Sequence, residues 1–303
     1  MKQVCVVTGA SGFIGRSLTS QLRLNPQINL LQLNNSIKKS DQQDYPKVDL
    51  QNLESVKKFI SEVRPDKIFH LASKSSVVDS WRSPTETILY NYEITNNIVK
   101  AINEISPMTR LIYFSSSAVY ARKNSSISET DDLGPDSPYG ISKLISEMSV
   151  ETLSNYLILR PFFIIGPGKK NDVIYDWFKQ ISETPSNKDI ELQVGNLGVV
   201  RDFMSCTDAT KLIIELEKKI QSSEIYNICS GEETYLKDLM KVFLEIVPSI
   251  TKVVENSDVK YRFRDRTYVV GNPSRLLEAQ IKVPKLDLRN LLKETYSNWQ
   301  SGR

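Results

Sequence analysis

A tyrosine and a lysine four residues apart, Tyr139 and Lys143, are suited to proton transfer. On a helix, residues with this spacing share one face, so the phenol and the ammonium are expected to lie close together. An unperturbed tyrosine titrates near pH ~10, and a neighbouring cation favours the phenolate, so we expect its pKa to move toward neutrality. Three serines at 115–117 precede the pair and can supply a hydroxyl that binds a substrate oxygen. The same spacing also occurs on surface helices that have no catalytic role.

A glycine-rich turn near the start of the chain is the second functional pattern. Residues 4–7 form an apolar run, and Gly9, Gly12 and Gly15 follow it. In a strand–turn–helix unit that binds a dinucleotide, the first glycine permits the tight turn, the second lets backbone approach the pyrophosphate, and the third lets the helix pack closely on the sheet. The helix N-terminus then offers free N–H groups to the phosphates. Apolar residues at helical spacing after the turn favour this interpretation over an ordinary strand–helix turn.

Apolar strands and amphipathic helices alternate through the first half of the chain. Strands are expected at 28–33, 67–72, 110–115 and 156–160, with a short strand end at 48–50, and helices at 56–63, 85–104 and 139–153. Repeated β–α units predict the α/β class, with a doubly wound parallel sheet, the Rossmann arrangement. Ligands of such sheets bind beyond the carboxyl ends of the strands.

The regular alternation ends near Gly166. Short strands are expected at 191–194, 200–204, 225–228 and 267–270, among helices at 207–219, 237–247, 274–279 and 288–299. This change in pattern divides the chain into a dinucleotide-binding Rossmann domain of residues 1–168 and 205–230 and a smaller substrate-binding α/β region of residues 169–204 and 231–303.

The composition is that of a globular protein. The chain has 303 residues, 40% of them hydrophobic, and a formal net charge of +3, with Lys and Arg scattered along it. This scatter argues against a nucleic-acid partner. No run of about 18 apolar residues and no leader pattern is present, so we expect no membrane partner and a cytoplasmic location. Cys5, Cys206 and Cys229 lack metal-ligand spacing, so neither a metal site nor a disulfide is expected.

Further motifs occur in the order typical of one superfamily. They are Thr8 to Gly15, 70–72, 116–120, 138–143, Arg160-Pro161, Gly166-Pro167, Gly195-Asn196, 201–203, Asp208 and 226–228 with Gly231. On these residues the chain resembles the extended short-chain dehydrogenase/reductase superfamily, in its branch of nucleotide-sugar epimerases, dehydratases and reductases. The stretches 70–81 with Pro84, 194–197 and 270–276 bring it closest to GDP-4-keto-6-deoxy-mannose reductases.

The resemblance implies three catalytic residues. Ser116 takes the place of the catalytic hydroxyl, Tyr139 that of the acid/base, and Lys143 that of the partner that also holds the nicotinamide ribose. Dehydratases of the family carry acids just after the hydroxyl for the elimination of water, whereas Ser117 and Ala118 stand there in this chain. The favoured function is NADP(H)-dependent reduction of the 4-keto group of a nucleotide-diphosphate 4-keto-6-deoxy sugar, preferably GDP-linked. The alternatives are a nucleotide-sugar 4-epimerase with a retained NAD and a non-catalytic dinucleotide-binding regulator.

The coenzyme is expected to be NADP(H), with NAD(H) as the alternative. Asn34 stands where an acid would bind the ribose of NAD, and Lys38-Lys39 follow, which suits a 2′-phosphate unless both lysines are only solvated loop charges. The resemblance places Asp49 at the adenine amino group, although a helix-leading aspartate is the alternative interpretation. The candidate coenzyme contacts are Gly9, Ser11, Gly12, Phe13, Ile14, Gly15, Arg16, Asn34, Asp49, Leu50, Leu71, Ala72, Ser73, Tyr139 and Lys143.

The substrate's diphosphate is expected to bind arginine, which forms forked hydrogen bonds to phosphate oxygens. The resemblance places Arg201 and Arg262 at such contacts, with Arg264 and Arg266 as close alternatives. The candidate substrate-binding residues are Ser75, Ser117, Asn196, Arg201 and Arg262. The only histidine, His70, lies among apolar residues and is expected to be structural.

Three positions depart from the family pattern. Phe163 replaces an asparagine, Ala121 a glycine, and Asn272 an aspartate, and these changes favour a bulkier or less polar sugar. Members of the family are often homodimers through helices equivalent to 85–104 and 139–153, so a homodimer is expected.

Overall fold

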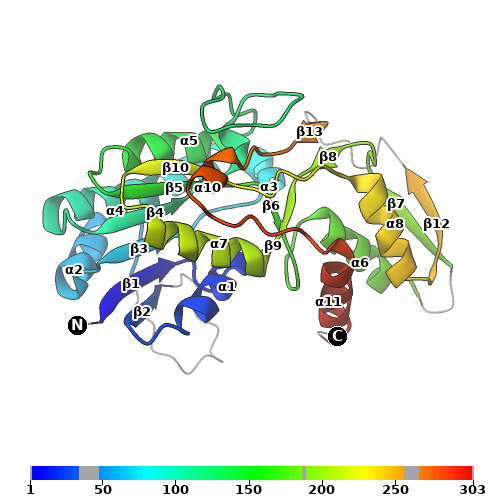
Figure 1. Ribbon diagram of the computed structural model, residues 1–303, viewed down its shortest axis with the longest axis horizontal. Helices are drawn as coiled ribbons and strands as arrows, with labels where there is room; N and C mark the ends of the chain where they lie inside the picture. Colours follow the sequence, from blue (N-terminus) through cyan, green and yellow to red (C-terminus); the bar gives the residue numbers. More distant parts are fainter. Residues whose placement is uncertain (1, 34–47, 186–188, 256–265, 302–303) are drawn as a thin grey trace.

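The computed structural model describes residues 2–33, 48–185, 189–255 and 266–301. Its largest element is a six-stranded sheet with the strand order β10-β5-β4-β3-β1-β2 (Figure 1). The strands are β1 (Gln3–Thr8), β2 (Ile28–Leu33), β3 (Lys67–His70), β4 (Arg110–Phe114), β5 (Tyr156–Pro161) and β10 (Glu224–Ile228). Every neighbouring pair is parallel. The predicted doubly wound parallel sheet is therefore confirmed.

Helices cover both faces of this sheet (Figure 1). One face carries α1 (Phe13–Leu22) and α7 (Cys206–Lys219), and the other carries α2 (Leu53–Val63), α4 (Pro84–Ile105) and α5 (Pro138–Val150). Successive residues of a strand point to opposite faces. Thus Val7 packs in one core with Leu18 of α1, while Val6 packs in the other with Ile98 of α4. Strands that are buried on both faces explain the continuous apolar runs in the sequence.

A smaller lobe lies at the other end of the molecule (Figure 1). It consists of α6 (Val173–Glu183), α8 (Leu236–Ile246), α11 (Leu288–Ser301) and the parallel pair β7 (Ile190–Val194) and β12 (Ile250–Glu255). Its core contains Trp177 and Phe178, whose rings both lie 5.0 Å from that of Phe243. A smaller α/β region in the second half is therefore present, and the proposed domain boundaries stay a prediction.

The remaining elements are short. They are α3 (Val77–Arg82), η1 (Ser117–Val119), α10 (Ser274–Glu278), the parallel pair β6 (Phe163–Ile165) and β9 (Phe203–Ser205), and β8 (Val200–Arg201) between β11 (Thr234–Tyr235) and β13 (Tyr268–Val269). The sequence analysis did not predict α3, α6, β6, β11 or β12.

The expected single strand at 200–204 is wrong, because the chain bends at Asp202. Its side chain is fully buried and accepts hydrogen bonds from Ser230 N (2.8 Å), Ser230 Oγ (2.6 Å), Gly231 N (2.9 Å) and Gly271 N (3.1 Å). A buried carboxylate needs such donors to replace water. The residues on either side of Asp202 therefore join two different sheets, as β8 and β9.

The expected strand end at 48–50 is also wrong. Asp49 Oδ1 accepts a hydrogen bond from Gln51 N (3.0 Å), and Asn52 N donates to Asp49 O (3.1 Å). Asn52 then caps α2, because its Oδ1 accepts from Ser55 N (3.0 Å). Asp and Asn side chains that bond to nearby backbone favour turns and helix starts over strands.

Within the described residues, no helix has the length and apolarity needed to cross a bilayer. The same residues contain no group of His, Cys, Asp and Glu that could hold a metal ion. The three cysteine thiols are free and buried.

Candidate active site

A cleft of about 380 Å³ opens at the carboxyl ends of the central strands, near the point where the strand order reverses between β1 and β3. This is the place where ligands bind in open α/β sheets. Most of the predicted coenzyme and catalytic residues line the cleft, namely Gly9, Ser11, Gly12, Phe13, Ile14, Gly15, Leu50, Leu71, Ala72, Ser73, Ser116, Tyr139 and Lys143. The structure therefore brings the glycine turn and the three catalytic candidates to one site.

Other cleft residues were missed by the sequence analysis. They are Leu33, Val48, Tyr90, Phe114, Pro161, Phe162, Ile164 and Lys169, whereas Ser115, one of the three serines named as hydroxyl candidates, also lines the cleft. Leu33, Phe114 and Pro161 end β2, β4 and β5, so the rule that ligands bind at strand ends could have found them. Lys169 follows β6, which was not predicted, and no pattern in the sequence indicated it.

The glycine turn has the geometry that its spacing predicts. Gly9 has a φ of +67°, which L side chains rarely adopt, and a Cβ on Gly15 would lie 2.3 Å from Gly9 O. Gly12 is the N-cap of α1, and no side chain in the described part of the chain caps the helix there. The first N–H groups of α1 are therefore available to an anion. These features fit the pyrophosphate of a dinucleotide.

Helix α5 places Tyr139 beside Ser116. Ser137 caps the helix, because its Oγ accepts a hydrogen bond from Gly140 N (3.1 Å). A Cβ on Gly140 would lie 2.5 Å from Ala118 O, so glycine allows the first turn of α5 to pack directly on η1. The Ser116 side chain lies close enough to the Tyr139 phenol to lower its pKa, against the effect of burial. The hydroxyl, the phenol and the cleft are thus brought into contact by one close helix packing.

Lys143 lies one turn further along α5 and is buried. Its Nζ donates a hydrogen bond to Phe114 O (2.8 Å) at the end of β4, and it lies 5.8 Å from the centroid of the Tyr139 ring. The expected pairing of the tyrosine and the lysine on one helix face is therefore present.

Burial controls the protonation of this pair. It raises the pKa of Tyr139 to about 12, against the opposing effect of the Ser116 hydrogen bond. Burial also lowers the pKa of Lys143 to about 7, against the attraction of Glu147. The expected shift of the Tyr139 pKa toward neutrality is wrong, because loss of water disfavours the charged form of each group. Tyr139 is a neutral phenol at pH 7, which is the form that donates a proton.

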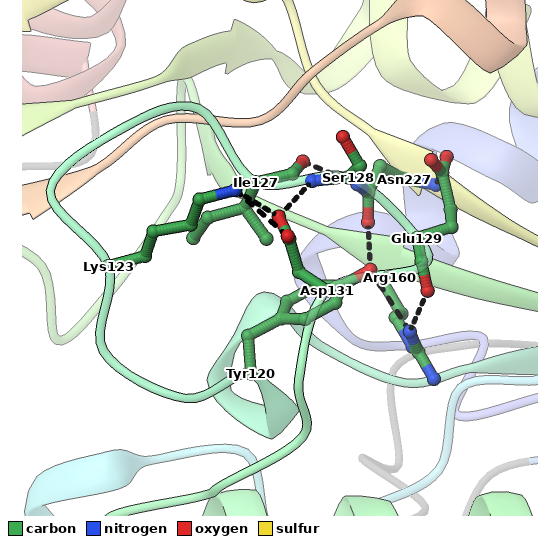
Figure 2. Close-up of polar contacts among 8 residues, drawn as sticks. All are labelled: Tyr120, Lys123, Ile127, Ser128, Glu129, Asp131, Arg160 and Asn227. Carbon is green, nitrogen blue, oxygen red and sulfur yellow. Dashed lines mark hydrogen bonds and ion pairs between the residues drawn. The ribbon is translucent and has the colours of Figure 1, made fainter.

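A buried ion pair between Glu147 and Arg160 joins α5 to β5. Glu147 lies one turn after Lys143, and its carboxylate accepts from Arg160 Nε (3.0 Å) and Nη2 (2.7 Å) on β5. Figure 2 shows the next layer, in which Arg160 Nη1 donates to Tyr120 Oη (3.0 Å) and Tyr120 Oη donates to Asn227 Oδ1 (2.6 Å). These bonds fix α5 to β5 and β10. They therefore hold Lys143 in a fixed position relative to the sheet.

Asn227 also anchors the segment between η1 and α5 (Figure 2). Asn227 N donates to Glu129 Oε1 (2.7 Å), and Asn227 Nδ2 donates to Ile127 O (2.9 Å). Asp131 closes the loop by accepting from Lys123 Nζ (2.7 Å) and Ser128 N (2.8 Å). The middle of the connection that carries the chain from Ser116 to Tyr139 is therefore held against β10.

His70 is structural, as the sequence analysis expected. It is fully buried at the end of β3, where its Nδ1 is hydrogen-bonded to Thr8 Oγ1 (2.7 Å) and its Nε2 to Thr95 Oγ1 (3.1 Å). Burial, with a smaller effect from the Lys143 charge, lowers its pKa to about 3. The imidazole is therefore neutral in the folded protein.

Because His70 is neutral only in the folded protein, the free energy of unfolding depends on pH in mild acid. The pKa of His70 is about 3 when folded, against 6.5 for an unperturbed histidine, so the unfolded chain binds the extra proton between these values. We expect the free energy of unfolding to fall by up to about 1.4 kcal/mol per pH unit as pH drops below 6.5. Denaturant titrations at several pH values should show this slope in the wild type and lose it in His70→Gln. Equal slopes in both proteins would contradict the assignment.

The predicted substrate residues lie apart from the cleft walls. Arg201 is buried in β8, where Nη1 donates to Val200 O (2.9 Å) and the guanidinium lies 5.2 Å from the Phe163 ring. Asn196 is exposed after β7, with Oδ1 accepting from Gly198 N (2.7 Å). Ser117 is buried as the first residue of η1. Of the predicted substrate residues that the structure describes, only Ser75 lines the cleft. Arg262 and Arg264 lie outside the described residues.

Two coenzyme candidates flank the cleft without lining it. Arg16 Nη1 donates to Ser11 O (2.7 Å), and exposed Asp49 bonds to the backbone ahead of α2. The turn around Asp49 matches the alternative of a helix-leading aspartate, and its adenine contact stays a prediction. Asn34 and Lys38-Lys39 lie outside the described residues.

A parallel sheet with a glycine turn at its switch point, and a Ser, Tyr and Lys in the same cleft, define a dinucleotide-dependent oxidoreductase fold. The model of the NAD dependent epimerase/dehydratase family matches residues 5–229, and the chain belongs to this family. It is therefore an NAD(P)-dependent enzyme of the short-chain dehydrogenase/reductase type, as the resemblance implied.

The alignments with similar proteins span nearly the whole chain. It is 27% identical over 312 residues to GDP-6-deoxy-D-mannose reductase of Pseudomonas aeruginosa, covering 99% of this chain and 98% of that protein. It is also 27% identical over 299 residues to GDP-6-deoxy-D-talose 4-dehydrogenase of Aggregatibacter actinomycetemcomitans, with 97% of each covered. The solved structure of RMD from Pseudomonas aeruginosa complexed with NADPH has a TM-score of 0.84 and 28% sequence identity, with 100% of both chains covered.

Proposed function

We propose that this chain is an NADP(H)-dependent reductase of the 4-keto group of a nucleotide-diphosphate 4-keto-6-deoxy sugar, with a GDP-linked sugar favoured. The observation that carries the proposal is that Ser116, Tyr139 and Lys143 line the same cleft as the glycine turn. Similarity to a GDP-6-deoxy-D-mannose reductase and a GDP-6-deoxy-D-talose 4-dehydrogenase supports a GDP-linked 6-deoxy sugar and chemistry at C4.

The three catalytic candidates then have separate roles. A bound nicotinamide coenzyme supplies the hydride that the carbonyl carbon accepts. Tyr139 Oη donates its proton to the carbonyl oxygen as negative charge develops there, and Ser116 Oγ stabilises that oxygen by a hydrogen bond. The Lys143 ammonium stabilises the phenolate that Tyr139 becomes, and solvent returns the proton. The sugar gains one hydride and one proton, and the coenzyme leaves oxidised.

NADP(H) is the coenzyme that we favour. The similar structure of RMD was solved with NADPH, and no acid stands between Leu33 and Asp41 in the sequence, where NAD would require one. The residues that would bind the 2′-phosphate, Asn34 and Lys38-Lys39, lie outside those that the structure describes. This preference therefore depends on the sequence and on the relative.

We also propose that the protein is a homodimer and that it is located in the cytoplasm. Helices α4 and α5 pack side by side on one face of the sheet, and both present apolar side chains to solvent. Leu89 on α4 is 59% exposed, and Ile141 and Met148 on α5 are 39% and 63% exposed. A second copy of the chain would cover this apolar surface.

The proposal is tested by incubating the purified protein with GDP-4-keto-6-deoxy-mannose and NADPH and following absorbance at the coenzyme band. We expect one NADPH to be oxidised for each sugar reduced. Isomerisation of a nucleotide sugar without net oxidation would contradict the proposal and favour the 4-epimerase. No reaction with any nucleotide sugar tested would favour the non-catalytic dinucleotide-binding regulator.

The epimerase alternative has one observation in its favour and one against it. The family includes epimerases by its description. However, an epimerase must begin by removing a proton from a sugar hydroxyl, which requires the phenolate. Burial raises the pKa of Tyr139 to about 12 and so favours the phenol. This protonation state suits reduction better than oxidation.

A further inference from the structure

The loop after β6, residues 166–170, reaches the start of α1. Gly166 and Gly168 have φ values of +147° and +78°, conformations that L side chains rarely adopt. A Cβ on Gly168 would lie 3.5 Å from Arg16 Nη2, and one on Gly166 would lie 3.7 Å from the Phe13 ring. The two glycines thus allow this loop to approach the helix whose N-terminus faces the cleft.

The loop carries Lys169 to the cleft. Lys169 Nζ lies 4.9 Å from the centroid of the Phe13 ring, and the residue lines the same cleft as the glycine turn. The charges of Lys169 and Arg16 both act on the Cys206 thiol, which donates a weak hydrogen bond to Phe13 O (3.8 Å). Two cations therefore lie around the first residue of α1.

These two cations are not balanced locally. Asp172 is the carboxylate that acts on Lys169, but its Oδ1 already accepts from Tyr175 N (2.7 Å) as the N-cap of α6. Among the described residues, Lys169 forms no ion pair with a carboxylate within 4.0 Å. Burial lowers the pKa of Lys169 although Asp172 attracts its charge, so the charged form is only partly compensated. An anion in the cleft would supply that compensation.

We propose that Lys169, flanked by Arg16, binds the diphosphate of the coenzyme from the side opposite the N–H groups of α1. The glycine turn offers dipoles and backbone donors, and Lys169 adds a full charge from the loop after β6. The inference rests on the proposed function, because it assumes that the cleft binds a dinucleotide. The diphosphate of a nucleotide-sugar substrate carries the same phosphate groups and is the alternative ligand of Lys169. We favour the coenzyme, because Lys169 lies over Phe13, next to the N-cap Gly12.

The test compares Lys169→Met with Lys170→Met, which removes the same charge from the exposed neighbouring residue. Dissociation constants for NADPH, NADH and GDP are measured by calorimetry on proteins with matched melting temperatures. For Lys169→Met we expect the Kd of both NADPH and NADH to rise about tenfold or more, while the Kd of GDP stays within about twofold. Lys170→Met should bind all three as the wild type does, and Lys169→Arg should recover most of the affinity.

Three results would overturn the inference. Weaker binding of NADPH with unchanged NADH would assign Lys169 to a 2′-phosphate, and weaker binding of GDP with unchanged NADH would assign it to the substrate's diphosphate. Unchanged affinity for every probe would show that the lysine binds no phosphate. In each case the wild type still binds coenzyme, so the proposed function stands. A wild type that binds neither coenzyme would instead refute the proposed function together with this inference.

Discussion

Replacing Tyr139 with phenylalanine is expected to lower kcat about 10²–10⁴-fold, the usual contribution of a positioned general acid. The substitution removes only the phenol hydroxyl, while the ring keeps its place in the cleft wall. The Kd of NADPH should therefore stay within about twofold of the wild-type value, because the lost interaction acts on the reacting oxygen. Single-turnover kinetics and coenzyme titration separate the two effects.

Tyr113→Phe is the matched control for this substitution. Tyr113 is buried in β4, and Lys143 Nζ lies 5.1 Å from its ring, about as close as to the Tyr139 ring. Loss of this second phenol hydroxyl should leave kcat nearly unchanged. A fully active Tyr139→Phe, or equal losses in the two variants, would remove Tyr139 from the role of proton donor.

Replacing Lys143 with methionine should both lower kcat and weaken coenzyme binding. Without the ammonium, the phenolate that forms at Tyr139 has no neighbouring positive charge, and we expect kcat to fall about 10²–10³-fold. The residue is also predicted to hold the nicotinamide ribose, so the Kd of NADPH should rise, in contrast to Tyr139→Phe. Comparing the two variants by calorimetry and steady-state kinetics tests this difference in role.

The same substitution should stabilise the protein, which excludes misfolding as the cause of inactivity. The pKa of Lys143 is about 7 when folded, against 10.5 for an unperturbed lysine, so its charge destabilises the native state at pH 7. As pH rises from 7 to 10.5, we expect the wild type to gain up to about 1.4 kcal/mol per pH unit relative to Lys143→Met. A variant less stable than the wild type at pH 7 would contradict the account of this buried lysine.

The first half of the fold, and the cleft that the candidate catalytic residues share, could be predicted because their signals are local. The glycine turn and the Tyr139–Lys143 pair each depend on spacing within a few residues, and the apolar strands of the central sheet stand out because both faces are buried. The resemblance then placed Ser116, whose contact with Tyr139 the structure contains.

The second half was harder to predict because long-range contacts determine it. Strand β12 pairs with β7, so Ile250 lies opposite Ile190, far away in the sequence. Lys169 reaches the cleft only because β6 and the glycines after it direct the loop toward α1. The direction of the Tyr139 pKa shift was wrong for a related reason, since sequence spacing shows the neighbouring cation but not the depth of burial.

In the proposed reaction, one sugar carbon receives a hydride while its oxygen receives a proton. Following deuterium from labelled NADPH into the product is the most direct test of this transfer. The wild type is incubated with GDP-4-keto-6-deoxy-mannose and NADPH that carries deuterium at the transferable position of the nicotinamide, and the product is analysed by NMR. The account predicts one deuterium at C4 of the sugar for each coenzyme oxidised, and none with Tyr139→Phe over the same time. A C4-altered product without deuterium, with the labelled NADPH unconsumed, would contradict it.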